Sequence, residues 1–423
     1  MRILVQKFGG TSVSDGERRA HVVRRIRAAL AAGFQPVIVV SAMGRRGDPY
    51  ATDTLLDQVR SVEPEPDARE EDLMISCGEV ISAVLLSATL RREGVGRPLT
   101  LTGGQSGILT DDHFGDARIL RVDPAPLHRR LEQGLLPVVT GFQGVTESGE
   151  VTTLGRGGSD TTAAALGVAL RAEEVEIYSD VEGVMTADPR IVPDARTLRV
   201  LTYEEVLQMA DLGSRIVHPR AVELAMQGNV PLRIRSTFSD HPGTRITHAF
   251  ESAGAWPDLY GGRIITGVAH MPDMCLVRVE GLPAGPERAG GGRGDDSGAV
   301  NRRIFRPLAE AGVSVDLINV SPERRSFIVR EAEAEKTRKI LESEGFQVEL
   351  LHDCAKVSVV GAGMRGLPGV MARVVEALAE RGIEILQTAD SHVTISCLVR
   401  GDQMEEAVRA LHRAFDLGGE RNA

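Results

Sequence analysis

Six short apolar runs, each ending in glycine or a small hydroxyl residue, constrain most strongly how this chain can fold. All six lie within about the first 250 of its 423 residues: ILVQKFGG, PVIVVSAMG, PLTLTGGQSG, PVVTGFQG, VEIYSDVEG and PLRIRSTFS. Nearly continuous apolar runs are typical of strands buried on both faces of a parallel sheet. Helical patterns separate the runs, so we predict a three-layer α/β/α sandwich with a mostly parallel sheet. Ligands of such sheets bind beyond the carboxyl ends of the strands, where the glycine turns would gather.

The last part of the chain contains an internal repeat. RIFRPLAEAGVSVDLINVSPERRSFIVR, from Arg303, aligns without a gap with RVVEALAERGIEILQTADSHVTISCLVR, from Arg373, at an offset of 70 (373 − 303). Each copy reads as helix, glycine stop, strand, turn and strand, which predicts two ferredoxin-like βαββαβ modules of the split βαβ kind. The second copy has no closing strand of its own, and we expect residues 263–270 to fold back and supply it.

The apolar pattern loosens around ESAGAWPDLYGG, which indicates a domain boundary near residue 255. The predicted organisation is given by five ranges: an α/β domain at 1–250, a linker at 251–262, a first module at 263–352, a second module at 353–416 and a tail at 417–423.

Composition excludes several classes of function. The net charge of −10 and the pI of about 5.6 argue against a nucleic-acid-binding surface, which must be basic. No apolar run is expected to approach the ~18 residues of a membrane span. The four cysteines are scattered without CxxC or Cys/His metal spacing. We therefore expect reduced thiols, no metal held by the protein and a cytoplasmic location.

Two glycine-rich stretches carry candidate chemistry. Lys7 precedes Gly9-Gly10 at a predicted strand end, where bare backbone N–H groups can approach a phosphate. The second stretch, GRGGSDTTAAA, combines Arg156, suited to a carboxylate, with a helix N-terminus that favours anions and with Asp160, which could hold a lysine or a metal. A capped helix after a glycine turn would explain Asp160 but not Arg156. Together the stretches predict a site for a nucleotide or a small anion.

Seven motifs in order along the chain carry a family resemblance: VQKFGGTSV, VVSAMG, SCGE, GFQG, TTLGRGGSDTTAAA, YSDVEGVMTADPR and HPRAVELA. With these motifs the chain resembles the aspartokinases of the amino-acid-kinase superfamily, and its C-terminal repeats resemble the family's paired ACT regulatory modules. SAMGRRGDPYATDTLL and ILQTADSH are most similar to the diaminopimelate-sensitive isozyme I. The resemblance implies transfer of the γ-phosphoryl group of ATP to the side-chain carboxylate of L-aspartate, with Mg²⁺ carried mainly by the phosphates. This reaction is the first step of lysine, diaminopimelate, threonine and methionine biosynthesis.

The resemblance also implies roles for particular residues. Three would be catalytic: Lys7 bridging the β- and γ-phosphates, Asp160 orienting that lysine, and Arg215. The residues implied to bind ATP are Lys7, Phe8, Gly9, Gly10, Thr11, Ser41, Ser179, Asp180, Met185, Thr186, Ala187, Asp188, Pro189, Arg190 and Arg215. The residues implied to bind the amino-acid substrate are Thr52, Glu79, Arg156, Gly157, Gly158 and Ser159. Two positions depart from the family pattern, because Met185 stands where an aromatic is frequent and Arg215 where lysine is frequent.

For the C-terminal modules the resemblance implies a homodimer or a larger homo-oligomer, with a feedback effector bound at the junction of the modules. The candidate effector contacts are Asp316, Asn319 and Ser321, together with Gln387 and Thr388 of the partner copy. Meso-diaminopimelate is the expected inhibitor, with lysine and threonine as alternatives.

Other interpretations stay open. The chain could phosphorylate glutamate or N-acetylglutamate, or it could be a non-catalytic amino-acid sensor. GAGMRG, from Gly361, matches a dinucleotide-binding fingerprint. Glu79 could begin the helix EVISAVLLSATL, Thr52 could be an N-cap, and His218 could be a packed turn residue.

Overall fold

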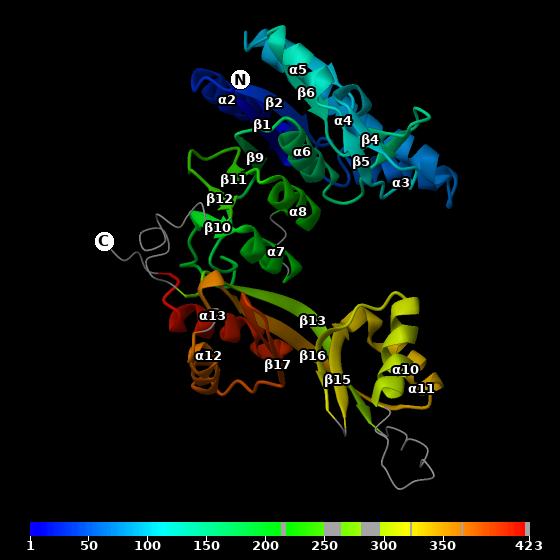
Figure 1. Cartoon of the computed structure of the whole chain (residues 1–423), viewed down its shortest axis with the longest axis vertical. Coiled ribbons are helices and arrows are strands. Elements are labelled where there is room, and N and C mark those ends of the chain that lie inside the picture. Colours follow the sequence, from blue (N-terminus) through cyan, green and yellow to red (C-terminus); the bar gives the residue numbers. More distant parts are fainter. Residues whose placement is uncertain (213–216, 249–263, 281–296, 322–323, 365–366, 419–423) are drawn as a thin grey trace. The chain divides into compact units, whose positions relative to one another are not determined.

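The computed structural model describes residues 1–423 except 213–216, 249–263, 281–296, 322–323, 365–366 and 419–423 (Figure 1). The chain divides into two compact units. The first comprises Met1–Val184 and Thr197–Gly262, and the second comprises Met185–Arg196 and Arg263–Ala423. The sequence prediction placed 185–196 in the N-terminal domain, whereas this segment packs with the C-terminal modules.

An eight-stranded sheet forms the centre of the first unit, in the order β10-β12-β11-β9-β1-β2-β6-β3. The six neighbouring strands from β11 to β3 are parallel, and they are the six apolar runs of the sequence. β12 is antiparallel to β11. The bounds of the strands are β1 (Ile3–Phe8), β2 (Gln35–Val40), β3 (Pro98–Leu101), β6 (Leu136–Thr140), β9 (Glu174–Ser179), β10 (Val200–Thr202), β11 (Leu232–Ser236) and β12 (Thr244–Thr247).

Helices cover both faces of this sheet, which confirms the predicted three-layer α/β fold (Figure 1). On one face α2 and α4 enclose a core that includes Phe8, Ile38, Leu86 and Tyr178. On the other face α6 packs against β1, β2 and β9, and α8 packs against α6. The bounds of the helices are α1 (Gly10–Val13), α2 (Gly16–Ala31), α3 (Thr52–Val62), α4 (Ala68–Arg92), α5 (Ala125–Glu132), α6 (Gly158–Ala169), α7 (Tyr203–Asp211) and α8 (Pro219–Gly228).

Helix α4 corrects the expectation that no apolar segment approaches the length of a membrane span. Among the described residues it is the one helix long and apolar enough, with a mean hydropathy of 1.9 over an 18-residue window. It packs against β3, β6 and β8 and carries Asp72 and Glu79 as buried carboxyl groups. These contacts are those of a core helix.

A small second sheet, in the order β5-β4-β7-β8, adjoins α4. Its strands are β4 (Ile108–Thr110), β5 (Ile119–Val122), β7 (Gln143–Val145) and β8 (Val151–Thr153). The fully buried carboxylate of Asp72 accepts hydrogen bonds from the backbone N–H groups of Gly115 and Thr153 and from the Thr153 hydroxyl, at 2.6–3.1 Å. Because a buried carboxylate must be satisfied by donors, these bonds fix α4 against the strand that leads into α6.

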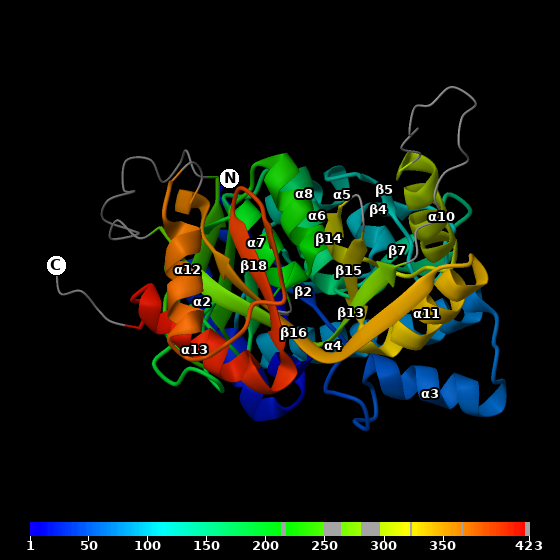
Figure 2. The ribbon, with the colours of Figure 1, turned by 90° about the horizontal axis from the view of Figure 1, so that it is seen from below.

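The second unit is built on one six-stranded antiparallel sheet, in the order β14-β15-β13-β16-β18-β17. Its two long strands, β13 and β16, run side by side through both modules (Figure 2). The beginning of β13, Gly267–Met271, pairs with Lys356–Val360 of the second repeat, the position that the sequence argument gives to the strand of residues 263–270. The bounds are β13 (Gly267–Glu280), β14 (Asp316–Val320), β15 (Arg325–Arg330), β16 (Gln347–Val360), β17 (Gln387–Asp390) and β18 (Thr394–Arg400).

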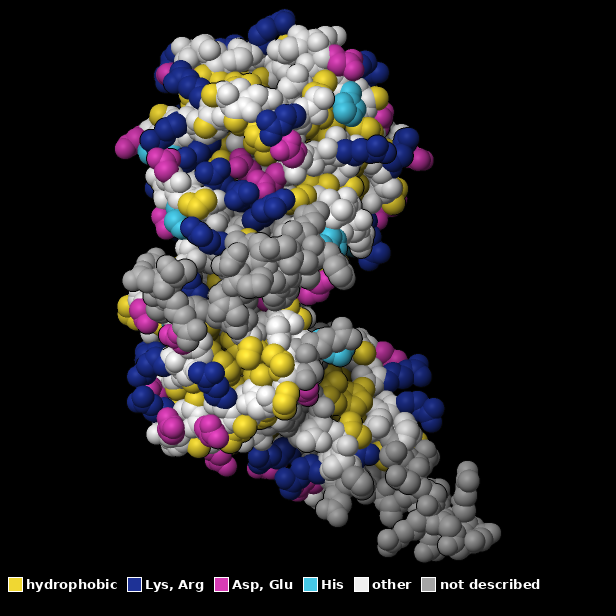
Figure 3. Space-filling view, turned by 60° about the vertical axis from the view of Figure 1, so that its left-hand side comes forward, with side chains coloured by type: hydrophobic (Ala, Val, Ile, Leu, Met, Phe, Trp, Pro, Cys, Tyr) yellow, Lys and Arg dark blue, Asp and Glu magenta, His cyan; other side chains and the backbone are white. Residues whose placement is uncertain are grey.

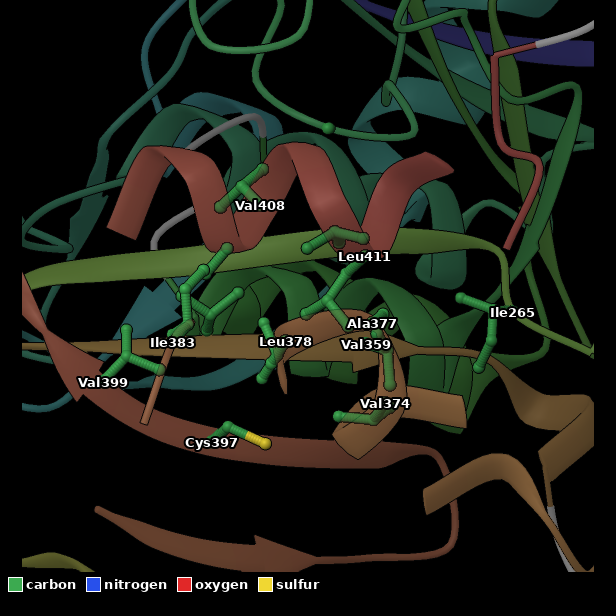
Figure 4. Close-up of a cluster of buried hydrophobic side chains, with 14 of the residues drawn as sticks. Ile265, Val359, Val374, Ala377, Leu378, Ile383, Cys397, Val399, Val408 and Leu411 are labelled. Carbon is green, nitrogen blue, oxygen red and sulfur yellow. The ribbon is translucent and has the colours of Figure 1, made fainter. Parts of the chain in front are cut away.

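Each module packs its own two helices on the sheet. In the first module α10 (Ser297–Glu310) and α11 (Ala334–Ser343) cover a core that includes Cys275 and Phe327. In the second, α12 (Val370–Ala379) and α13 (Met404–Ala414) enclose the aliphatic cluster of Figure 4, with Leu378 and Leu411 at its centre. Ala187, Ile191 and Val192 join this second cluster, which is why 185–196 belongs to the second unit.

Candidate active site

Lys7 and Asp160 meet at the edge of the central sheet, as the sequence predicts for two residues of one site. Lys7 is the last residue but one of β1, and Asp160 lies in the first turn of α6. Lys7 Nζ is 2.7 Å from Asp160 Oδ1, and each side chain is only 12–13% exposed. The carboxylate therefore fixes the ammonium group in place.

The glycine turn after β1 runs tightly along neighbouring strands. The Gly9 N–H donates to the Tyr178 carbonyl at the end of β9, and the Ser41 N–H, just after β2, donates to the Phe8 carbonyl, both at 3.2 Å. A Cβ at Gly10 would lie 2.4 Å from the Ala42 carbonyl oxygen, so only glycine fits there. A Cβ at Gly9 would lie 3.8 Å from Lys7 Nζ, so the turn passes directly beside the lysine ammonium.

A cleft of about 800 Å³ opens beside this turn in the first unit. Thr11 and Asp180, both predicted to bind nucleotide, line it. Arg45 also lines the cleft and forms an ion pair with Asp180 at 3.0 Å. Ser179 ends β9 next to Ser236 of β11, so it lies on the same sheet edge.

Glu79 is a buried carboxyl group behind the strand ends. The Ala42 N–H donates to its Oε1 at 2.9 Å, while its Oε2 is buried and has no hydrogen-bond partner among the described residues. Burial raises the pKa of Glu79 to about 8. An unsatisfied buried carboxyl oxygen is a natural acceptor for a cationic ligand group, because pairing would offset its desolvation.

Helix α4 does not begin at Glu79, contrary to one interpretation of the sequence. It begins at Ala68, so Glu79 lies mid-helix and is not placed there by the helix dipole. Its neighbour Gly78 allows a close approach, since a Cβ there would lie 2.9 Å from the Tyr50 carbonyl. Thr52 begins α3 just after that contact, and the N-cap is Ala51 rather than Thr52.

The loop before α6 carries the remaining predicted substrate residues. Arg156 is exposed, Gly157 adopts a left-handed conformation with φ of 69°, and Gly158 and Ser159 are buried in the first turn of α6. A Cβ at Gly157 would lie 2.2 Å from the His218 ring, so the imidazole packs directly on this loop. The structure thus brings Asp160 to Lys7 and leaves the Arg156 guanidinium at the surface of the same loop.

The remaining predicted nucleotide residues are not in the described part of the first unit. Met185–Arg190 belongs to the second unit, where the Thr186 hydroxyl lies 3.0 Å from His412 Nε2 and Asp188 pairs with Arg190. The Arg190 guanidinium lowers the pKa of Asp188. Arg215 lies outside the described residues. Their roles in binding ATP remain predictions.

The predicted effector residues cluster where β14 meets β17. Asp316 Oδ2 is 2.5 Å from Lys356 Nζ, and Gln387 accepts from the Ser326 hydroxyl at 2.8 Å and donates to the Leu317 carbonyl. Ser321 closes the turn after β14 by bonding the Arg324 carbonyl, while Asn319 and Thr388 are exposed on the two strands. Polar groups of both repeats therefore converge within one chain.

The fold excludes the interpretation of GAGMRG as a dinucleotide-binding fingerprint. The strand before it, β16, lies in an antiparallel sheet, and α12 does not begin until Val370. Gly361 is needed for another reason, because a Cβ there would lie 2.3 Å from the Ile264 carbonyl.

The sequence argument missed three residues that shape the site. One is Asp72, which lies in the polar first turns of α4 and is nevertheless fully buried. The others are Arg18 and Phe238 in the cleft, with the guanidinium 5.7 Å from the ring centroid. They approach only through the fold. On the face shown in Figure 3, basic and acidic side chains are interspersed.

The three-layer fold and the lysine–aspartate pair at its glycine-rich sheet edge define an amino acid kinase. The model of the Amino acid kinase family matches residues 2–236, and an ACT domain model matches 349–413. The chain belongs to the amino acid kinase family and, within it, to the aspartokinases. It is 45% identical to Aspartokinase 1 of Bacillus subtilis over 417 residues, covering 99% of this chain and all of that protein. It is 41% identical to the Aspartokinase of Geobacillus stearothermophilus, covering 100% and 99% of the two chains.

A solved structure supports the fold alone. Aspartokinase III of E. coli, in complex with aspartate and ADP, matches with a TM-score of 0.73 at 24% identity, covering 98% of this chain and 99% of that one.

Proposed function

We propose that this chain phosphorylates the side-chain carboxylate of L-aspartate with Mg-ATP, giving 4-phospho-L-aspartate. The ion pair between Lys7 and Asp160 at the edge of the parallel sheet carries the proposal. It is supported by the family of the chain and by the relatives named Aspartokinase.

The chemistry requires neutralisation of charge rather than proton removal. The attacking carboxylate of aspartate is already ionised, so no general base is needed, but two anions must approach each other. Lys7, held by Asp160, would bridge the β- and γ-phosphates, while the N–H group of Gly10, at the start of α1, would approach the same oxygens. Such fixed positive groups stabilise phosphoryl transfer by positioning and electrostatics. Mg²⁺ would be carried by the phosphates, and Arg215 would add positive charge.

Substrate selection would come from two groups. The unpartnered Oε2 of Glu79 would accept the α-ammonium of aspartate, and the exposed Arg156 would bind a carboxylate through its planar fork. Together they favour an amino acid with a free ammonium group, which distinguishes aspartate and glutamate from N-acetylglutamate.

A coupled assay of ADP release tests the proposal. The purified chain is given Mg-ATP with aspartate, glutamate, N-acetylglutamate or no acceptor, and the acyl phosphate is trapped with hydroxylamine. We expect ADP release and hydroxamate formation with aspartate alone. Turnover with another acceptor would assign a different kinase of the family, and no turnover with any of them would favour a sensor.

We also propose the finer features that the resemblance implies. These are a cytoplasmic enzyme at the first step of the aspartate-derived amino-acid pathways, assembly into a homodimer or larger oligomer through the ACT modules, and feedback inhibition by meso-diaminopimelate, as in isozyme I. The cluster around Asp316 and Gln387 would contact the effector. Inhibition assays with meso-diaminopimelate, lysine and threonine identify the effector, and inhibition by either of the last two alone would reject the isozyme assignment.

A further inference from the structure

Three metal-ligating side chains of different chemistry meet in the first ACT module, far along the chain from one another. Cys275 lies on β13, Glu331 begins the short 3-10 helix η2 (Glu331–Glu333) that follows β15, and His352 lies on β16. Their ligand atoms, a thiol sulfur, a carboxylate oxygen and a ring nitrogen, all lie within 4.8 Å of one another.

The cluster is partly buried, and one of its polar atoms lacks a hydrogen-bond partner within the part of the chain that the structure describes. Cys275 is fully buried in the core of the module, whereas the Glu331 and His352 side chains are 36% and 47% exposed and leave a path from solvent. His352 Nδ1 is 2.5 Å from Glu331 Oε1. The second carboxylate oxygen, Glu331 Oε2, is buried and has no hydrogen-bond partner among the described residues. A buried oxygen in that state is costly unless a cation or a donor reaches it.

We propose that Cys275, Glu331 and His352 form a binding site for Zn²⁺ that joins β13, η2 and β16. Sulfur, nitrogen and carboxylate oxygen are the ligand types zinc takes, at about 2.0–2.3 Å from the metal. In a tetrahedron those bond lengths separate the ligand atoms by roughly 3.3–3.8 Å. Atoms near the 4.8 Å limit must therefore approach by about 1 Å, whereas His352 Nδ1 and Glu331 Oε1, now 2.5 Å apart, must separate. Side-chain rotation of the two partly exposed ligands supplies these adjustments.

The internal repeat provides a comparison within the same chain. Glu331 corresponds to Gly401 at the offset of 70, and the strand beginning at Cys275 corresponds to the one beginning at Ala355, an offset of 80. Asp273 and Asp353, also 80 apart, share the unusual left-handed backbone, with φ of 57° and 53°.

At the same offset of 80, Pro272 occupies in the second module the position that His352 occupies in the first. The second module therefore has alanine, glycine and proline where the first has cysteine, glutamate and histidine. The fold of the module does not by itself require these three side chains.

Metal binding would exchange one proton for the ion. Burial raises the pKa of the Cys275 thiol to about 12, so the free thiol is neutral, and it must lose its proton to solvent as the sulfur–zinc bond forms. Neutral His352 donates a ring nitrogen lone pair and the Glu331 carboxylate an oxygen, which leaves the fourth position for water. Because the ion binds only the folded arrangement, zinc would stabilise the regulatory unit.

The test uses the full chain, freed of metal by a chelator, loaded with Zn²⁺ and freed of unbound ion by gel filtration. We expect one retained zinc per chain in the wild type. His352→Asn and Glu331→Gln, both at partly exposed side chains, should each weaken zinc binding at least about tenfold. His392→Asn, at an exposed histidine of the second module, is the matched control and should bind as the wild type does.

Cobalt substitution identifies the sulfur ligand. Co²⁺ bound to the wild type should show a thiolate-to-cobalt charge-transfer absorption that His352→Asn reduces and His392→Asn keeps. The proposal is overturned if the wild type retains no zinc, if both ligand variants bind as tightly as the wild type, or if the cobalt spectrum lacks the thiolate band. These readouts do not depend on kinase activity.

Discussion

The buried carboxyl group of Glu79 leads to a quantitative prediction about substrate binding. Its pKa is raised to about 8, because burial disfavours the ionised form by more than the backbone hydrogen bonds, including that from the Ala42 N–H, favour it. The free enzyme at pH 7 therefore holds this group mostly protonated. An ammonium group paired with Oε2 stabilises the ionised form, so aspartate binding should expel the proton.

The magnitude follows from that pKa. At pH 7, one unit below this pKa, about nine-tenths of the enzyme molecules carry a proton on Glu79, and at pH 8 about half of them do. Aspartate binding should therefore release roughly 0.9 proton at pH 7 and roughly 0.5 at pH 8. Since only the ionised form binds well, the affinity for aspartate should rise about fivefold between those two pH values.

Isothermal titration of aspartate into the enzyme measures this directly. The binding heat is recorded in two buffers of different ionisation enthalpy, and the difference gives the number of protons released. Glu79→Gln should abolish both the proton release and the pH dependence and should weaken binding. Glu70→Gln, at an exposed position of α4, should behave as the wild type. Binding heats that are independent of buffer in the wild type, with unchanged affinity in Glu79→Gln, would refute the assignment of this carboxyl group to the ammonium.

Three further predictions address catalysis and stability. Lys7→Met should lower kcat at least about 100-fold without lowering the melting temperature, since a preorganised positive group at the phosphates is lost; retention of most activity in a steady-state assay would rule out the phosphate role. The ligand-free enzyme should lose stability as the pH rises from about 4.5 to about 8, because in that window Glu79 stays protonated in the folded state but loses its proton in the unfolded chain. Glu79→Gln should flatten this part of the plot of melting temperature against pH. An unchanged slope would contradict the raised pKa. Leu378→Ala should destabilise the second ACT module by about 2–5 kcal/mol, because it opens a cavity in a fully buried cluster. The matched change Leu378→Ile should cost less than about 1.5 kcal/mol. Similar melting curves for the two variants would argue against a packed core around Leu378.

The central sheet was predictable because its strands are buried on both faces. An apolar run such as PVIVVSAMG is then almost continuous and ends in a recognisable turn, so its position in the chain gives its place in a parallel sheet. The pairing of Lys7 with Asp160 was expected from the family resemblance, and the structure shows the two side chains in contact.

The features that the sequence did not predict depend on contacts between residues that are distant in the chain. One open interpretation put Glu79 at a helix start, whereas α4 begins 11 residues earlier, at Ala68, with turns that are polar. The packing of Ala187 and Ile191 with the second module depends on long-range contacts that no local pattern shows. For the same reason Cys275, Glu331 and His352, which lack short metal-ligand spacing, were not expected to meet.

A crystal structure with aspartate and a non-hydrolysable ATP analogue tests the central claim most directly. The account predicts the γ-phosphate against Lys7 Nζ and the glycine turn, with the aspartate ammonium on Glu79 and its side-chain carboxylate facing the phosphate. A nucleotide bound away from Lys7, or an aspartate whose ammonium does not reach Glu79, would contradict it.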